Sequence, residues 1–341
     1  MAFTGPHTTR PHASQPPRTL DRPTVSFELF PPRTPQTLEK LWTTVESLAA
    51  VRPDFISVTY GASGSTRATT RELVRELLAS TSVLPIAHLT CVGASRAEVT
   101  AVIEEFLDEG VRSFLALRGD PPQDQPGWRP SPDGLTRASQ LIELIREVES
   151  SRCDTSASQA LRGAAHKLSV AVAAFPCGNP VTGSSRAQDL RALLAKQEAG
   201  ADFAITQLFF DPESYLGLVR DARAAGITIP VVAGLIPTTD PARLLRVQAL
   251  TGVPVPRDLL ARLEAADGAA ARHRVGIRAS VDVAKAVLDG GAPGLHIYTF
   301  NSHVAALDLL EGAHLGGGAP MAPDLASGPQ VSFDALDYVS I

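Results

Sequence analysis

Short runs of apolar residues alternate along the chain with longer segments whose apolar positions recur every three to four residues. The runs are typical of strands buried on both faces, and the longer segments are typical of amphipathic helices. The first such segment carries Leu38, Leu41, Trp42 and Val45, which share one face of a helix. Eight runs are expected to be strands: Thr24–Phe30, Phe55–Tyr60, Pro85–Cys91, Val111–Leu117, Leu168–Phe175, Phe203–Phe209, Ile227–Leu235 and Leu295–Phe300.

Two kinds of signal mark where the intervening helices begin. A Ser or Thr followed three residues later by Glu or Gln, the spacing of a capping box, occurs at residues 69–72, 95–98 and 185–188. A capping aspartate followed directly by proline occurs at Asp211-Pro212 and at Asp240-Pro241. These signals place helices between the predicted strands.

Continuous apolar strands joined by helices predict a parallel sheet with right-handed crossovers. Eight such units close into a barrel. We therefore predict the α/β class and a single-domain (β/α)8 TIM-type barrel over residues 23–311, with disordered tails at 1–22 and 312–341. An open doubly wound sheet is the alternative, although neither GxGxxG nor GxxxxGK(S/T) occurs in the chain.

Composition narrows the class of function. The net charge of −5 and the scattered Lys and Arg residues predict no nucleic-acid partner and no anionic membrane partner. Cys91, Cys153 and Cys177 have no CxxC spacing, so neither a disulfide framework nor a zinc site is expected. No apolar run is long enough to span a bilayer. We expect a cytoplasmic enzyme acting on a small molecule, with homo-oligomer formation left open.

The carboxyl ends of barrel strands carry catalytic groups, and four predicted strands end in polar residues. Glu28 stands in an apolar strand, where burial would raise its pKa and suit it to general acid catalysis. His88 ends the third strand, and Arg118 and Asp120 flank a glycine after the fourth. Gln207, after the sixth, can donate and accept hydrogen bonds at once, which suits the edge of a flat heterocycle.

Each of these residues also has a purely structural interpretation. Glu28 could pair with a buried Arg or Lys, His88 and Gln207 could make core hydrogen bonds, and Arg118 could pair with Asp120 within its own turn. No two His residues have metal-ligand spacing with a carboxylate, so we expect no catalytic metal. No G-x-S-x-G elbow occurs either. The set favours proton transfer beside a flat ligand over nucleophilic hydrolysis.

Eight segments, in this order, resemble the methylenetetrahydrofolate reductase family: VSFELFPPRT (25–34), ISVTYGA (56–62), AHLTC (87–91), ALRGDPP (116–122), VAAFP (172–176), AGADFAITQLFFD (199–211), AGLIP (233–237) and HIYTFN (296–301). The resemblance implies an α/β barrel that reduces 5,10-methylenetetrahydrofolate to 5-methyltetrahydrofolate in one-carbon metabolism and methionine supply. It implies FAD as cofactor and NADH or NADPH as donor, in a ping-pong cycle.

The resemblance also implies residue roles. Glu28 matches the general acid that assists opening of the folate ring, and Asp120 matches a catalytic carboxylate near flavin and pterin. Asp120, Gln207 and Arg243 match substrate-binding positions, with Gln207 contacting folate and nicotinamide in turn. Cofactor-binding positions are matched by Thr59, Tyr60, Ala62, His88, Arg118, Gly119, Asp120, Ala138, Phe175, Asp189 and Lys196.

The chain departs from the family pattern at several positions. Ala192 and Ala195 stand where an Asn and an Arg usually grip the cofactor's phosphate and adenosine end. Other departures are Cys177 and Asn179 for Glu and His, Arg243 and Val247 for Gln and Phe, and Ser302 for Arg. A flavin-independent folate reductase or a folate methyl-transfer barrel is therefore the alternative. A folate-binding protein without turnover is a third reading, opposed by the retention of Glu28 and Asp120.

Overall fold

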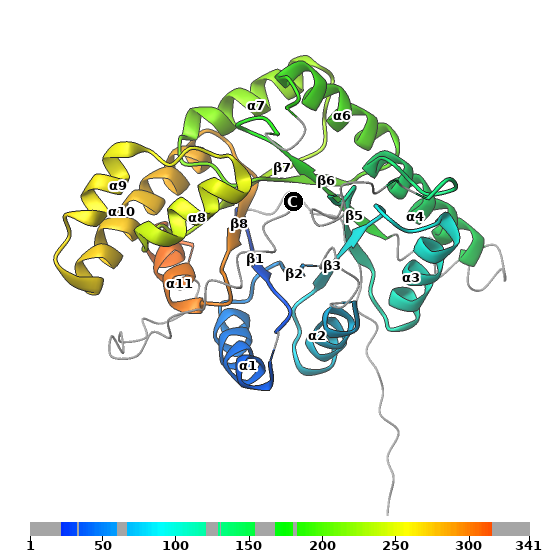
Figure 1. Ribbon diagram of the computed structural model, residues 1–341, viewed down its shortest axis with the longest axis horizontal. Coiled ribbons are helices and arrows are strands. Elements are labelled where there is room, and N and C mark those ends of the chain that lie inside the picture. The colour runs from blue at the N-terminus through cyan, green and yellow to red at the C-terminus, as the bar shows by residue number, and fades with distance from the viewer. Residues whose placement is uncertain are drawn as a thin grey trace, which may run out of the picture.

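Eight parallel strands form one closed barrel in sequence order, with β8 paired back to β1 (Figure 1). The computed structural model describes residues 22–32, 34–59, 67–120, 129, 131–153, 168–179 and 183–315. The strands are β1 (Thr24–Leu29), β2 (Phe55–Val58), β3 (Pro85–Thr90), β4 (Ser113–Leu117), β5 (Ser169–Ala174), β6 (Phe203–Thr206), β7 (Val231–Leu235) and β8 (Gly294–Tyr298). The closed sheet confirms the predicted TIM barrel and excludes the open doubly wound alternative.

Helices surround the barrel (Figure 1). They are α1 (Pro35–Ala50), α2 (Arg67–Ser80), α3 (Arg96–Asp108), α4 (Ala138–Cys153), α6 (Arg186–Glu198), α7 (Pro212–Ala224), α8 (Pro241–Thr251), α9 (Arg257–Glu264), α10 (Gly268–Asp289) and α11 (His303–Gly312). None of the helices in the described residues is both long enough and apolar enough to cross a bilayer. The tails expected at 1–22 and 312–341 lie outside the described residues, except for Arg22 and residues 312–315.

Four of the five capping signals placed a helix start correctly. Ser95 and Ser185 each form the predicted capping box, and Asp211 and Asp240 cap α7 and α8 ahead of a proline. The start of α2 was predicted wrongly, because this helix begins at Arg67, before the capping box expected at residues 69–72. Within this helix the Thr70 hydroxyl donates to the Thr59 carbonyl oxygen at 3.0 Å.

Alternation along the strands divides their apolar side chains into two sets. One set points outward from the strands and packs against the helices, as Phe27 and Leu29 do on β1. The other set fills the inside of the barrel, where Leu115, Ala171 and Phe203 belong to a second cluster. Polar residues occupy the remaining interior positions, mainly on β1, β2, β3 and β8: Ser26, Glu28, Ser57, His88 and His296, all buried. The barrel interior therefore has an apolar side and a polar side.

The seam between β1 and β8 closes the barrel and holds the polar side in place. The Thr299 hydroxyl donates to the Glu28 carbonyl oxygen at 2.6 Å. The Asn301 side chain accepts from the Phe30 N–H at 2.8 Å and donates to the Phe30 carbonyl oxygen at 2.9 Å. Phe300 and Asn301 adopt left-handed backbone conformations, with φ of 49° and 57°. The chain thus turns sharply after β8, and one amide side chain pairs with both backbone groups of Phe30, directly after β1.

Candidate active site

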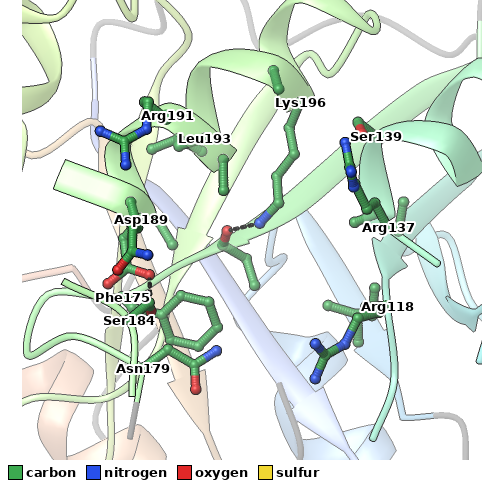
Figure 2. A pocket seen from close by; sticks show the side chains of 18 of the residues that line it. Arg118, Arg137, Ser139, Phe175, Asn179, Ser184, Asp189, Arg191, Leu193 and Lys196 are labelled. Atoms are coloured by element: carbon green, nitrogen blue, oxygen red, sulfur yellow. Dashed lines mark hydrogen bonds between the residues drawn. The ribbon is translucent and has the colours of Figure 1, made fainter. Parts of the chain in front are cut away.

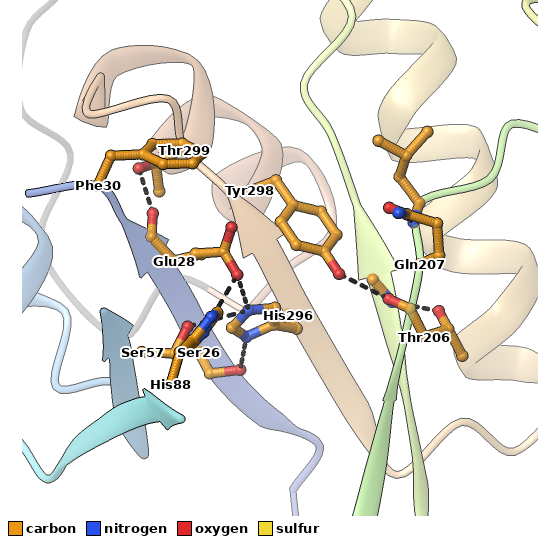
Figure 3. A network of polar contacts seen from close by, with 12 residues as sticks. Ser26, Glu28, Phe30, Ser57, His88, Thr206, Gln207, His296, Tyr298 and Thr299 are labelled. Carbon is orange, nitrogen blue, oxygen red and sulfur yellow. Dashed lines mark hydrogen bonds and ion pairs between the residues drawn. The ribbon is translucent and has the colours of Figure 1, made fainter. Parts of the chain in front are cut away.

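Glu28 lies inside the barrel beside two imidazoles (Figure 3). Its Oε2 atom is 3.5 Å from Nε2 of His88 and 3.8 Å from Nε2 of His296. Glu28 Oε2 and His88 Nε2 have no hydrogen-bond partner among the described residues. Within the same residues, no Arg or Lys forms an ion pair with Glu28, so the structural alternative considered for this carboxyl is not found.

Burial sets the protonation state of this group of residues. It raises the pKa of Glu28 to about 7, and the nearby His88 opposes this rise. It lowers the pKa of His88 to about 4 and the pKa of His296 to about 3. Both imidazoles are therefore neutral at neutral pH, while the carboxyl still holds a proton in much of the population. A carboxyl in that state can act as a general acid.

His296 was missed by sequence reasoning. Its Nδ1 lies 2.9 Å from the Ser26 hydroxyl oxygen, and its Nε2 lies 3.4 Å from that of Ser57. The Phe55 ring stacks on the imidazole at a centroid distance of 5.7 Å. A signal was present, because His296 and Tyr298 alternate along the last strand and that period turns both side chains to one face.

A cavity of about 620 Å³ opens beside the ends of β4 and β5, between α4 and α6 (Figure 2). Its volume suits a small organic ligand. The cavity brings together seven of the residues predicted to bind a cofactor: Arg118, Gly119, Asp120, Ala138, Phe175, Asp189 and Lys196. Residues far apart in the sequence are thus joined in one site by the closed barrel.

In the turn after β4, the charged side chains find some of their partners within the turn itself. Arg118 Nη2 lies 3.6 Å from Asp120 Oδ1, and Arg118 Nε donates to the Gly119 carbonyl oxygen at 3.1 Å. Both charged side chains are nevertheless about one-third or more exposed. Gly119 has a φ of 81°, and a Cβ there would lie 2.6 Å from Val92 Cγ1. The turn therefore requires glycine, and its charged groups stay accessible from the cavity.

The α6 side of the cavity carries a second charged pair. Lys196 Nζ donates to the Ala173 carbonyl oxygen at 2.8 Å and lies 6.0 Å from the centroid of the Phe175 ring. Burial lowers the pKa of Lys196 to about 8, and Asp189 opposes that shift. The Asp189 Oδ1 atom accepts a hydrogen bond from the Ser184 hydroxyl. Asp189 is thereby fixed within reach of the cavity.

Comparison with known proteins identifies the family. The profile of the family described as methylenetetrahydrofolate reductase matches residues 15–314. The 5,10-methylenetetrahydrofolate reductase of Pectobacterium carotovorum subsp. carotovorum is 34% identical over 278 residues, which are 81% of this chain and 85% of that protein. The chain belongs to the methylenetetrahydrofolate reductase family. The Escherichia coli (strain K12) enzyme of the same name is 33% identical over 278 residues, 81% of this chain and 86% of its own length.

Plant members of the methylenetetrahydrofolate reductase family are longer than this chain. The probable methylenetetrahydrofolate reductase (NADH) of Oryza sativa subsp. japonica is 31% identical over 85% of this chain but only 48% of its own length. Among solved structures, an uncharacterized protein from Clostridium thermocellum that binds two copies of 5-methyl-5,6,7,8-tetrahydrofolic acid has a TM-score of 0.54 at 15% identity. The match covers 86% of this chain and 93% of that one, and it supports the fold alone.

Several residues predicted for the reductase site lie elsewhere than in the cavity. Gln207 is buried after β6, and its amide oxygen accepts from the Leu208 N–H at 2.9 Å, a local bond of the kind the structural alternative proposed. Arg243, on α8, places its guanidinium 5.6 Å from the centroid of the Phe300 ring. Thr59 is buried, and its hydroxyl has no partner among the described residues. Tyr60 and Ala62 fall outside the described residues.

The two carboxylates of the predicted reductase site stand on different parts of the barrel. Asp120 lines the cavity after β4, whereas Glu28 is held inside the barrel on β1. Their expected position on either side of one ligand stays a prediction. The described residues contain no cluster of three or more His, Cys, Asp or Glu side chains that could hold a metal ion.

Proposed function

We propose that this chain reduces 5,10-methylenetetrahydrofolate to 5-methyltetrahydrofolate, with FAD as cofactor and a nicotinamide dinucleotide as donor. Family membership supports the reaction class. The observation that carries the proposal is Glu28, a buried carboxyl with a pKa of about 7 between two neutral imidazoles. Opening of the folate ring requires a proton on the leaving nitrogen, and Glu28 is the group in the described barrel suited to supply it near neutral pH.

Glu28 keeps its proton because its surroundings give a negative charge little support. His88 and His296 are the nearest basic groups, and burial lowers the pKa of each well below neutrality. Neither imidazole takes the proton from the carboxyl at rest. Proton transfer to a folate nitrogen at Glu28 Oε2 is therefore the favoured route, and the reaction leaves a carboxylate that regains its proton from solvent.

The lining of the cavity supports FAD as the cofactor. Arg118, Lys196 and the N-terminus of α4 would face its phosphates, and Phe175 offers an aromatic surface to a flat ring. When bound, the flavin supplies the hydride that converts the folate methylene carbon to a methyl group. Asp120 lines the same cavity and would favour a developing positive charge on the folate.

We infer that donor and folate occupy one site in turn, beside Gln207 and Arg243. Gln207 can donate and accept through one amide, so it can serve a nicotinamide amide and a pterin edge alike. Arg243 is a half-buried cation suited to an anionic part of the substrate. We further propose that residues 23–311 form the catalytic unit, working in the cytoplasm, and that the donor is either NADH or NADPH.

One observation favours the alternative of a flavin-independent reductase. Ala192 and Ala195 line the cavity where the family resemblance leads one to expect an Asn and an Arg. Neither alanine side chain can donate a hydrogen bond to a cofactor. In that reading, hydride would pass directly from the nicotinamide donor to the folate.

The test is to purify the protein without added cofactor, record its visible spectrum, and measure formation of 5-methyltetrahydrofolate with NADH and NADPH, with and without FAD. We expect bound flavin, or FAD that binds on addition and stimulates the reaction. Formation of the product by a colourless protein that FAD neither binds nor stimulates would establish the flavin-independent alternative. No product under any of these conditions would reject the reductase proposal.

A further inference from the structure

The α6 wall of the cavity offers few groups to an anion. Ala192 and Ala195 line the cavity there, and neither side chain carries a donor. Lys196 is a cation of this wall, but its Nζ already donates to the Ala173 carbonyl oxygen at 2.8 Å. Arg191 also lies on α6 and lines the cavity, so this wall offers an anion two cations, and further partners must come from the facing wall.

Two arginines lie together on the wall that faces α6. Figure 2 shows Arg118 and Arg137 on one side of the cavity and Asp189 and Asn179 on the other. Arg118 is partly engaged with Asp120 and with its own turn. The Arg137 side chain is exposed and forms neither an ion pair nor a hydrogen bond within the part of the chain that the structure describes. Its whole guanidinium group is therefore free to bind a ligand.

The N-terminus of α4 opens onto the cavity at the same place. The first helical hydrogen bond runs from the Leu141 N–H to the Arg137 carbonyl oxygen at 3.3 Å. The amide groups of Ala138 and Ser139 precede that bond and have no partner within the helix. Both residues line the cavity. A helix of 16 residues thus presents its positive end to the ligand space beside the two arginines.

The charge of the cavity differs in sign from that of the whole chain. Its lining holds four cationic side chains, Arg118, Arg137, Arg191 and Lys196, against the two acids Asp120 and Asp189. The chain as a whole has a net charge of −5. A positive cavity in an acidic protein selects an anionic ligand.

We propose that Arg137, together with Arg118 and the N-terminus of α4, binds the diphosphate of the dinucleotide in this cavity. That a dinucleotide occupies the cavity rests on the proposed function. The planar guanidinium fork matches two phosphate oxygens, which a point charge such as Lys196 does not do. Arg137 thereby supplies from the α4 side the contacts that Ala192 and Ala195 leave absent on α6. FAD, NADH and NADPH all carry this diphosphate.

The experiment compares ligands with and without phosphate. The unmodified protein, Arg137→Ala and Arg137→Lys are titrated with FAD and with riboflavin, which has the same ring and no phosphate. We expect Arg137→Ala to raise the Kd for FAD roughly tenfold or more and to leave riboflavin binding unchanged. Arg137→Lys should recover part of the loss. Arg274→Ala, which changes an exposed arginine on α10 away from the cavity, should leave both affinities unchanged.

A second pair of ligands, NADH and nicotinamide riboside, separates this proposal from the proposed function. If the unmodified protein binds NADH but not FAD, the flavin part of the proposed function fails, and the NADH pair then tests Arg137. If the unmodified protein binds a dinucleotide and Arg137→Ala binds it equally well, the role of Arg137 is overturned alone. Equal losses for FAD and riboflavin overturn it too. An unmodified protein that binds no dinucleotide overturns both proposals.

Discussion

The state of Glu28 follows from a competition between burial and neighbouring charge. Burying a carboxylate without a neighbouring cation costs free energy, so a carboxyl group in that position keeps its proton. His88 could supply the cation, but its own burial opposes protonation more strongly than Glu28 favours it. The site therefore rests with a neutral acid and neutral bases, which leaves the proton on Glu28 available for transfer.

Replacing Glu28 by Gln tests this assignment through the pH dependence of the rate. Folate reduction by the unmodified protein should fall as the pH rises above about 7, because the acid loses its proton there. Glu28→Gln should lower the rate by roughly 100-fold or more and remove this pH dependence, since the Gln amide has no acidic proton to transfer. Single-turnover folate reduction across the pH range is the measurement. A variant with an unchanged rate would remove Glu28 from the mechanism.

The same substitution should change stability in the opposite direction. The folded protein holds a proton on Glu28 up to pH of about 7, whereas the unfolded chain releases it near the ordinary value of 4.5. The folded state is therefore progressively disfavoured as the pH rises through this window, and the full penalty persists above it. We expect Glu28→Gln to be more stable than the unmodified protein at pH 8, on the order of 3 kcal/mol at most.

Urea unfolding at pH 8 and at pH 5 measures this difference. At pH 8 both His88 and His296 are neutral in the folded and unfolded states, so the gain belongs to Glu28. At pH 5 the gain should shrink, because the carboxyl is then largely protonated in the folded protein and partly so in the unfolded chain. A variant that is less stable at pH 8 would show that Glu28 is held as a carboxylate.

At the scale of elements, sequence patterns located most of the barrel. Runs of apolar residues identified all eight strands, because a strand buried on both faces is apolar along its whole length. Local hydrogen bonding identified helix starts such as those at Ser95 and Asp211, because a cap is fixed by residues two or three apart. The division of the region before β8 into α8, α9 and α10 was not predicted, since it depends on how these helices pack on one another.

Some residues of the candidate site were predicted from the sequence and others were not. Glu28 and Asp120 were predicted because polar groups at the ends of apolar strands are conspicuous in a sequence, whereas cavity residues on the helices, such as Asp189 and Lys196, were predicted from the family resemblance. His296 and Arg137 were not. The role of His296 depends on the interior register of β8 against β1, and that of Arg137 on a wall built jointly by β4 and α4. Such juxtapositions arise only when the barrel closes.

Two helical glycines test how closely the elements pack. Gly276 on α10 is pressed against the loop after β7, where an added Cβ would lie 1.7 Å from the Thr238 carbonyl oxygen. Gly217 on α7 faces only the far end of the Arg220 side chain, at 3.5 Å. We expect Gly276→Ala to lower the free energy of unfolding by about 2 kcal/mol or more, because backbone must move. Gly217→Ala should raise it by about 0.5–1 kcal/mol through helix propensity.

Chemical denaturation of both variants provides the comparison, and each serves as the control for the other. The substitutions are chemically identical and both lie inside helices, so a difference in sign isolates the close approach of α10. Equal effects at the two positions would mean that α10 does not rest against Thr238 as the structure shows.

For the molecule as a whole, closure of the barrel and placement of the acid are one event. Glu28 stands on the first strand and His296 on the last, so their approach exists only when β1 pairs with β8. The polar side of the interior depends on contacts such as those of the Ser26 and Ser57 hydroxyls with His296, and on the Phe55 ring stacked on that imidazole. The seam residues Thr299 and Asn301 satisfy the backbone of β1 where the sheet pairing ends.

Asn301 therefore tests whether the seam supports both stability and function. Asn301→Ala removes the two hydrogen bonds to Phe30 and places an alanine at a φ of 57°, where a residue with a Cβ is strained. The free energy of unfolding should therefore fall by about 2–4 kcal/mol. Asn301→Gly loses the same bonds without the backbone penalty, and should cost about 1 kcal/mol less. Urea unfolding of both variants separates the loss of the hydrogen bonds from the backbone strain. Folate reduction should fall in both variants, because the end of β1 that carries Glu28 is no longer fastened to β8; full activity in a destabilised variant would show that the seam stabilises the barrel without positioning the acid.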